Sequence, residues 1–181
     1  HLVQQGCKRI VHLTANLTRN VYANRFAGYK AALRDHRISF NEKYVLITDL
    51  QKKACVEAAA LIAKMRPLPD GLFVTNDISA AMCIQTFKEL GIKVPDDIAV
   101  VGFNNDSVST IIEPKLTTID YPGTSMGEVA ARNLINHLNG KGDIRHTSSI
   151  LIRSELIVRE SSLRKNINGA KAQQQIQLPN N

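Results

Sequence analysis

The sequence lacks several features that would place it in a specialised class of protein. Tryptophan is absent, and aromatic residues make up 5% of the 181 residues. No uninterrupted apolar run approaches the ~20 residues of a membrane-spanning helix, and no basic and then apolar leader opens the chain. The three cysteines are an odd number without a Cys-x-x-Cys spacing. This usage argues against a disulfide framework and a zinc site, and it is typical of a reducing compartment.

Motifs of nucleotide-binding and hydrolytic enzymes are missing as well. There is no Gly-x-Gly-x-x-Gly after an expected strand, no phosphate-binding P-loop and no Gly-x-Ser-x-Gly elbow. The five histidines are isolated from one another, so we expect neither a metal site nor a cofactor. His12 lies inside an expected strand and Cys83 on an expected buried helix face, so both are interpreted as core residues.

The charge is positive but dispersed. The 23 Lys and Arg against 16 Asp and Glu give a net charge of +7, and a basic surface is common among nucleic-acid-binding proteins. No run of five basic residues exists, and acidic residues are interspersed. We therefore expect no specific DNA binding by this chain itself.

The first residues have the pattern of a helix end. His1 to Gly6 resemble last helical turns, with Gly6 as a left-handed stop. Because the chain opens on the end of a helix and not on Met, we expect it to be a piece of a longer protein.

Short apolar runs then alternate with stretches of helical periodicity. Strands are expected over 8–14, 43–48, 72–75 and 98–103, and helices over 23–36, around 55–62, over 77–90 with Asp77 as N-cap, and over 124–138. Residues 116–119 and 150–158 are expected to be extended. The alternation predicts an α/β fold with a parallel sheet flanked by helices on both faces. The Gln- and Asn-rich residues 161–181 predict a polar, flexible tail.

Polar residues collect in the loops that follow the expected strands. Parallel sheets bind ligands beyond the carboxyl ends of their strands, where these loops meet. The candidates are Arg19, Arg25, Asn76, Asn104, Asn105 and Asp106. Guanidinium and amide groups give directed hydrogen bonds to a polyhydroxylated or anionic small molecule. For Asn76 and Asp106, simple capping of a helix or turn is an equally good interpretation.

Three stretches carry a family resemblance. They are HLVQQGCKRI at 1–10 with NRFAGY at 24–29; TND at 75–77 with LG at 90–91 and VPDDIAVVGF at 94–103; and PKLTTI at 114–119 with ELIVRES at 155–161. In this order they resemble the effector-binding domain of lactose-repressor-type (LacI-type) bacterial transcription regulators. The resemblance covers residues 1–161 and the C-terminal portion of that domain only. The closing LIVRES resembles the regulators and not their periplasmic relatives.

The resemblance implies a periplasmic-binding-protein-like fold of two lobes with an effector in the cleft between them. Residues 1–118 would form the C-terminal lobe. Residues 119–147 would cross over and supply a helix of the N-terminal lobe, which is otherwise missing, and residues 148–160 would return before the tail at 161–181. Operator DNA would be bound by an N-terminal helix-turn-helix that has no counterpart in this chain.

The resemblance also implies site residues. Arg25 would grip the effector, Arg19 would be a second contact, and Asn76 would bind sugar hydroxyls. Asn104 stands where sugar-responsive members usually carry Asp, and Tyr121 is a weaker match to a further contact. An amide in place of a carboxylate, beside two arginines, makes an acidic sugar or another anion an alternative to a neutral sugar.

The function implied is that of a cytoplasmic, non-enzymatic effector sensor without a membrane partner. Family members pair through equivalents of residues 77–90 and of Ile111 and Ile112, so a homodimer is expected. The effector could be an inducer or a corepressor. A periplasmic sugar-binding protein and an α/β-fold enzyme remain alternatives, although no nucleophile–base pair or cofactor loop supports the enzyme.

Overall fold

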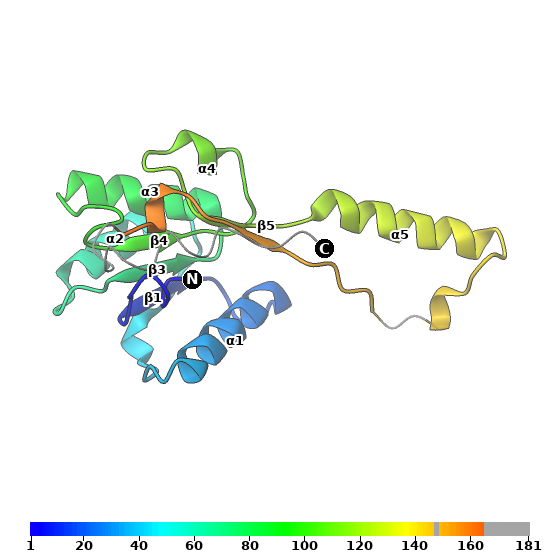
Figure 1. Ribbon diagram of the computed structural model, residues 1–181, viewed down its shortest axis with the longest axis horizontal. Coiled ribbons are helices and arrows are strands. Elements are labelled where there is room, and N and C mark those ends of the chain that lie inside the picture. Colours follow the sequence, from blue (N-terminus) through cyan, green and yellow to red (C-terminus); the bar gives the residue numbers. More distant parts are fainter. Residues whose placement is uncertain (147–148, 165–181) are drawn as a thin grey trace, which may run out of the picture.

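A computed structural model describes residues 1–146 and 149–164. Four parallel strands form the central sheet in the order β2-β1-β3-β4 (Figure 1). The strands are β1 (Ile10–Thr14), β2 (Val45–Ile47), β3 (Gly71–Val74) and β4 (Ala99–Val101). Their register aligns Val11 with Leu72 and Leu72 with Val100. The predicted parallel α/β fold is therefore confirmed.

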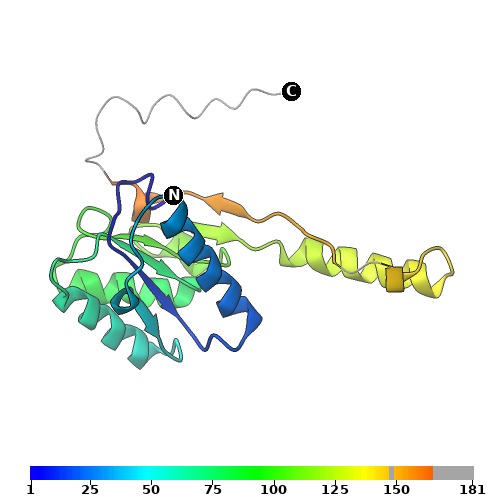
Figure 2. The same cartoon turned by 90° about the horizontal axis from the view of Figure 1, so that it is seen from below.

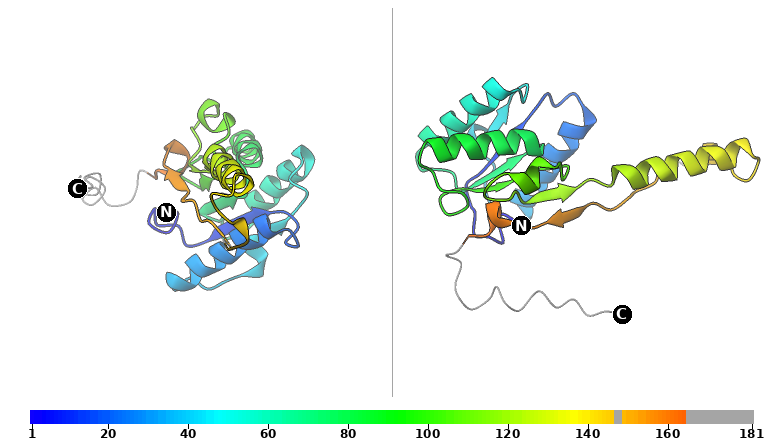
Figure 3. Two further views of the ribbon diagram at one scale, coloured as in Figure 1. Left: turned by 90° about the vertical axis from the view of Figure 1, so that its right-hand side faces the viewer. Right: turned by 90° about the horizontal axis from the view of Figure 1, so that it is seen from above.

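Helices cover both faces of this sheet. The helix α1 (Asn20–Asp35) lies on one face, and α2 (Lys52–Lys64) and α3 (Asp77–Glu89) lie on the other (Figures 1 and 3). Figure 2 shows α1 lying across its face of the sheet. Each connection between neighbouring parallel strands is thus a helical crossover, as such sheets require.

The alternation of side chains along the strands divides the core into two parts. Val11 and Leu13 pack with the buried residues of α2 and α3, whereas Ile10 packs with those of α1. The larger part includes Phe87, which is fully buried. Burial of such a side chain contributes about 1.5–3 kcal/mol, so these contacts hold the helices on the sheet.

The first residues form hydrogen-bonded turns, and residues 1–6 contain no assigned helix. The backbone N–H of Gln5 donates to the carbonyl of His1 at 2.9 Å, and that of Cys7 donates to Leu2 at 3.0 Å. Gly6 has a φ of +81°. A glycine in the left-handed region with this pairing is typical of a helix C-terminus.

A second, smaller sheet leads away from the first. The strands β5 (Thr118–Asp120) and β6 (Glu155–Ile157) pair antiparallel, with Ile119 opposite Leu156. Between them in the chain, α5 (Gly123–Leu138) and a 3-10 turn (Ile144–His146) project from the body of the molecule (Figure 1). No residue of α5 is buried, so an apolar side of this helix is left uncovered in the described part of the chain.

The polar, flexible tail was expected to begin at residue 161, and this expectation is wrong. Ser161 and Ser162 are fully buried in a 3-10 turn, Glu160–Ser162. The Ser161 hydroxyl donates to the carbonyl of Val100 at 2.7 Å and accepts from the N–H of Thr117 at 2.8 Å. Small hydroxyl side chains can be buried when both their donor and acceptor are paired, and composition alone does not reveal this pairing. The remainder of the expected tail, 165–181, lies outside the described residues.

Two short helices complete the fold. A 3-10 turn, Glu42–Tyr44, precedes β2, and α4 (Val108–Ile111) follows the loop after β4. None of the helices in the described ranges is long and apolar enough to span a membrane.

Gly102 is the position where the packing leaves least room. A Cβ there would overlap the Asp77 carboxylate and lie 2.9 Å from Leu116 Cδ2. We predict that Gly102→Ala lowers the free energy of unfolding by about 1–3 kcal/mol, as over-packing of a core does. Urea denaturation would measure this loss.

Gly28→Ala is the matched control, because a Cβ at Gly28 in α1 meets nothing within 4 Å. In a helix this change should be neutral or stabilising by up to ~1 kcal/mol. Equal stability of Gly102→Ala and the parent protein would contradict this account of the packing.

Candidate functional site

The candidate residues lie around the carboxyl edge of the parallel sheet. Arg19 precedes α1 in the loop after β1, Asn76 follows β3, and Asn104 lies in the loop after β4. β1, β3 and β4 are neighbours in the sheet, so these loops meet at one edge. The topology therefore brings together residues that are far apart in the sequence.

Arg25 is the best-defined member of the site. It lies in the second turn of α1, and its Nη1 donates to the carbonyl of Thr75 at 2.7 Å. Its guanidinium carbon lies 3.7 Å from the centroid of the Phe103 ring. This contact is a cation–π interaction, and it fixes the plane of the guanidinium. Among the residues that the structure describes, Arg25 forms no ion pair, so a salt bridge to Asp106 does not explain it.

Burial sets the electrostatics of Arg25. Partial burial lowers its pKa, and the nearby hydroxyls of Tyr22 and Tyr121 act in the opposite direction. A guanidinium has five N–H donors and stays charged at any physiological pH. With one donor on Thr75, the group keeps further donors for an anionic or hydroxylated ligand.

Asn76 has a structural role as well as a place in the site. Its Oδ1 accepts from the N–H of Ser79 at 2.8 Å and so caps α3. Asp77 was expected to be this cap, and that expectation is wrong because Asp77 is already helical and fully buried. The capping interpretation of Asn76 therefore holds, and its amide NH2 is the group that remains for a ligand.

The loop after β4 has an unusual backbone. Asn104 and Asn105 have φ values of +116° and +57°, a region that Asn tolerates better than most residues. The Asn104 amide Nδ2 approaches Asp106 Oδ2 at 3.4 Å, which is a long contact. Asp106 donates its own N–H to Asp77 at 2.8 Å. The Asn104 side chain is therefore weakly held at the edge of the sheet.

Arg19 and Tyr121 are more loosely placed. Both are exposed, Tyr121 by 46%, and neither side chain makes a hydrogen bond to another described residue. Tyr121 directly follows β5 and lies close enough to Arg25 to affect its pKa. Two residues that adjoin Arg25, Tyr22 and Phe103, were not identified as candidates from the sequence. Tyr22 lies three residues before Arg25 on α1, a spacing that could have indicated it.

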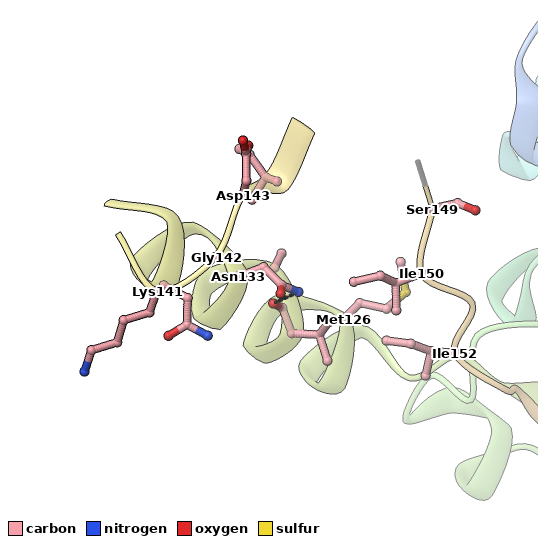
Figure 4. Close-up of a pocket in the computed structure, with 12 residues that line it drawn as sticks. Met126, Asn133, Lys141, Gly142, Asp143, Ser149, Ile150 and Ile152 are labelled. Carbon is pink, nitrogen blue, oxygen red and sulfur yellow. Dashed lines mark hydrogen bonds between the residues drawn. The ribbon is translucent and has the colours of Figure 1, made fainter. Parts of the chain in front are cut away.

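Two hollows lie near these elements. One, of about 430 Å³, is mostly apolar, and Arg25, Tyr29, Phe103, Ile119 and Leu156 are among the residues that line it. The other, of about 520 Å³, lies between α5 and the returning chain, where Ile150 and Ile152 lie opposite Met126 (Figure 4). Only the first includes a predicted site residue. The larger hollow is therefore not the candidate site.

In the described part of the chain, no group of three or more His, Cys, Asp or Glu side chains is arranged to hold a metal ion. The candidate edge carries the Arg25 guanidinium, the amides of Asn76 and Asn104 and the carboxylate of Asp106. Guanidinium and amide groups give directed hydrogen bonds to a small molecule.

Comparison with known proteins decides the family. The model of the periplasmic binding protein-like domain matches residues 1–162. The chain belongs to this family.

Its relatives are transcription regulators. The HTH-type transcriptional repressor PurR of Photobacterium profundum is 30% identical over 161 residues, which are 89% of this chain and 48% of the repressor. The complex of the transcriptional regulator CelR with cellobiose superposes with a TM-score of 0.80 at 26% identity, covering 88% of this chain and 48% of that one. A sugar-binding LacI-family regulator from Escherichia coli, complexed with phosphate, superposes with a TM-score of 0.79 at 27% identity, covering 88% of this chain and 56% of that one.

The periplasmic binding protein-like domain here spans about half the length of the curated relatives that it matches. The resemblance to the effector-binding domain of LacI-type regulators, in its C-terminal portion, is confirmed. The comparisons favour a regulator over a periplasmic sugar-binding protein, and they point away from an enzyme.

His12 in this domain is a packed core residue. Its ring stacks with Phe26, Tyr29 and Phe73, the last at 4.6 Å between centroids. Its Nδ1 contacts the Phe73 carbonyl at 3.3 Å, and its Nε2 has no partner among the described residues. Burial lowers the pKa of His12 to about 4, so the imidazole is neutral in the folded protein.

His12 should make the domain sensitive to mild acid. Below its ordinary pKa of about 6.5 the unfolded chain binds a proton that the folded chain does not, so stability falls as the pH drops from about 6.5 towards 4. We predict a loss of about 2 kcal/mol between pH 7.5 and pH 5 from this residue. Urea denaturation of the parent protein and of His12→Phe at both pH values would measure it. The same pH-dependent loss in both proteins would show that His12 is not its source.

Proposed function

We propose that this chain is the effector-sensing part of a LacI-type transcription regulator. The observation that carries the proposal is the convergence of Arg25, Asn76 and Asn104 at the carboxyl edge of the sheet. Donors from α1, from the start of α3 and from the loop after β4 come to the edge of the sheet that such folds use for ligands. The relatives that the chain matches are repressors and regulators, which supports this assignment.

The proposed effector is a sugar-like molecule that carries an anionic group. Arg25 supplies a positive charge that no described carboxylate neutralises in an ion pair. Of the nearby carboxylates, Asp120 accepts from Asn105, and Asp106 lies 3.4 Å from the Asn104 amide. The case for an anion therefore rests on the Arg25 guanidinium and not on Asn104, whose amide lies beside a carboxylate. A neutral sugar is the alternative outcome.

The proposed mechanism is a shift between two arrangements of lobes. β5 and β6 lead to α5, whose uncovered apolar side includes Met126, Leu134 and Ile135. We infer that α5 packs in a second lobe, which a longer protein would supply. A ligand that binds the closed arrangement better shifts the population towards it. An N-terminal helix-turn-helix of the longer, cytoplasmic protein would then change its affinity for operator DNA. The affinity would rise if the effector is a corepressor and fall if it is an inducer.

A homodimer through α3 and α4 is also part of the proposal. Ile78, the second residue of α3, and Leu90, which follows this helix, are exposed, and Ile111 at the end of α4 is 75% exposed. Exposed large apolar side chains can mark a surface that a partner covers. Ile112 differs from its neighbour, because it packs against the core of its own lobe. Ile111 is therefore the residue that tests the dimer.

A thermal-shift screen of the full-length protein tests the ligand class. Glucose, cellobiose, gluconate, glucose 6-phosphate and adenine represent neutral sugars, sugar acids, sugar phosphates and nucleobases. Binding to the folded state alone raises the melting temperature with concentration. We expect the anionic sugars to give the largest rise. A rise with cellobiose alone would favour a neutral sugar, and no rise with any compound would count against the proposed site.

Arg25→Lys tests the site residue by residue. Lysine keeps the charge but loses the two-pronged geometry of the guanidinium. We predict that the affinity for the compound found in the screen falls at least tenfold, about 1.4 kcal/mol. Isothermal titration would measure it, with Arg34→Lys, an exposed change on the same helix, as the control. Unchanged affinity together with a lowered melting temperature would mean that Arg25 only ties α1 to Thr75.

Ile111→Asp tests the dimer. A carboxylate in an apolar interface is poorly solvated, so we predict that the dimer dissociates at least tenfold more readily. Sedimentation at tens of micromolar would measure this, with the melting temperature as a check of the fold. Leu61→Asp on α2, an exposed apolar position outside both proposed interfaces, is the matched control. A parent protein that sediments as a monomer would contradict the proposal.

A further inference from the structure

One side chain beside the candidate site touches both strands that lead away from the lobe. The Asn105 amide Nδ2 donates to Asp120 Oδ1 at 3.1 Å, and its Oδ1 accepts from Arg159 Nη2 at 2.9 Å. Asp120 is the last residue of β5, and Arg159 follows β6 by two positions. A single amide therefore bridges the outgoing strand and the returning chain.

Arg159 is held in place for this contact. Its Nη1 donates to the carbonyl of Leu116 at 2.8 Å and to the Ser109 hydroxyl at 3.1 Å. Its backbone N–H donates to Thr117 Oγ1, and that hydroxyl also lies 2.8 Å from the Arg159 carbonyl. Among the described residues it forms no ion pair. The guanidinium is thus used for neutral hydrogen bonds, and its planar fork gives them a fixed direction.

The backbone of the loop makes contacts of its own. Asn105 lies in the left-handed region, and its N–H donates to Thr118 Oγ1 at 3.3 Å. Both ends of its side chain are occupied, so Asn105 is not free to bind a ligand. The side chain of its neighbour Asn104 has only the long contact to Asp106, while the Asn104 backbone N–H donates to the carbonyl of Ile119 at 3.0 Å. The side chain of Asn105 therefore adds contacts to a loop whose backbone already pairs with β5.

We propose that Asn105 and Arg159 are positioning residues that couple the loop carrying Asn104 to both crossover strands. This inference rests on the proposed function, because that function gives Asn104 a ligand. In the described part of the chain, β5 and β6 are the connection between the lobe and the α5 arm (Figure 1). A change in the angle of the arm must be taken up there. Coupling of this kind is reciprocal, so ligand at the loop and angle of the arm would bias each other.

Hydrogen exchange of the full-length protein without ligand tests the coupling. Asn105→Gly removes the amide while keeping a residue that accepts the left-handed backbone, and Arg159→Met removes the guanidinium. We expect each change to raise exchange about tenfold in the loop 103–107 and also in 118–121 and 155–158, since local opening follows the hydrogen bonds lost. Because the bond between Asn105 and Arg159 is shared and is lost only once, the rise in the double variant should be smaller than the product of the two single rises. Arg153→Met, an exposed change on the same returning segment, is the control.

Asn105→Asp separates coupling from general loosening. The new carboxylate keeps the bond to Arg159 but repels Asp120. Exchange should therefore rise more in 118–121 than in 155–158, which pairs with it in the β5–β6 ladder. If Arg159→Met fails to fold, Arg159→Lys replaces it, with an intermediate rise expected.

A rise confined to 103–107 in every variant, or additive effects in the double variant, would overturn the proposal. The Arg25→Lys titration is a separate test of the proposed function. If Arg25→Lys weakens ligand binding but exchange does not rise together in the loop and the strands, only the coupling proposal is wrong. If exchange rises together but no ligand is found, only the proposed function is wrong.

Discussion

The buried carboxylate of Asp77 is the interaction on which the rest of the site depends. It accepts from the Thr118 hydroxyl at 2.6 Å and from the N–H of Asp106 at 2.8 Å. Burial raises the pKa of Asp77, although these bonds oppose the shift. One side chain thereby joins the start of α3, the loop after β4 and the start of β5. A buried carboxylate persists only when its oxygens are paired, so these three elements are fixed together. The absence of a Cβ at Gly102 leaves room for it.

Under the proposed function, this junction would let ligand binding and lobe movement share one small region. The parallel sheet gathers the ends of β1, β3 and β4 at one edge, and Arg25 reaches that edge from α1 through its bond to Thr75. The junction continues through Asn105 to β5 and the chain after β6. Under the proposed function, a ligand at the edge would act on a loop that is already bonded to the crossover strands. The proposed ligand residue Asn104 and the coupling residue Asn105 are neighbours in the chain, so no long pathway would be needed.

The sequence predicted the order of strands and helices and the loops of the candidate site. Both depend on local patterns, namely apolar periodicity and the rule that parallel strands end at one edge. It did not predict contacts that depend on three-dimensional register. Asn76 and not Asp77 caps α3, because the helix begins one position earlier than a cap at Asp77 requires. Ser161 is buried, and its hydroxyl donates to the carbonyl of Val100, 61 residues away in the sequence. The Arg159 guanidinium donates to the Asn105 amide oxygen across 54 residues, and no local pattern indicates such a contact.

The central claim is that small-molecule recognition takes place at the carboxyl edge of the sheet. A crystal structure of the full-length protein with the compound that most raises its melting temperature tests this claim most directly. The account predicts that the compound lies within hydrogen-bond distance of the Arg25 guanidinium and of the amides of Asn76 and Asn104. A compound bound instead in the hollow between α5 and the returning chain, against Met126 and Ile150, would contradict it.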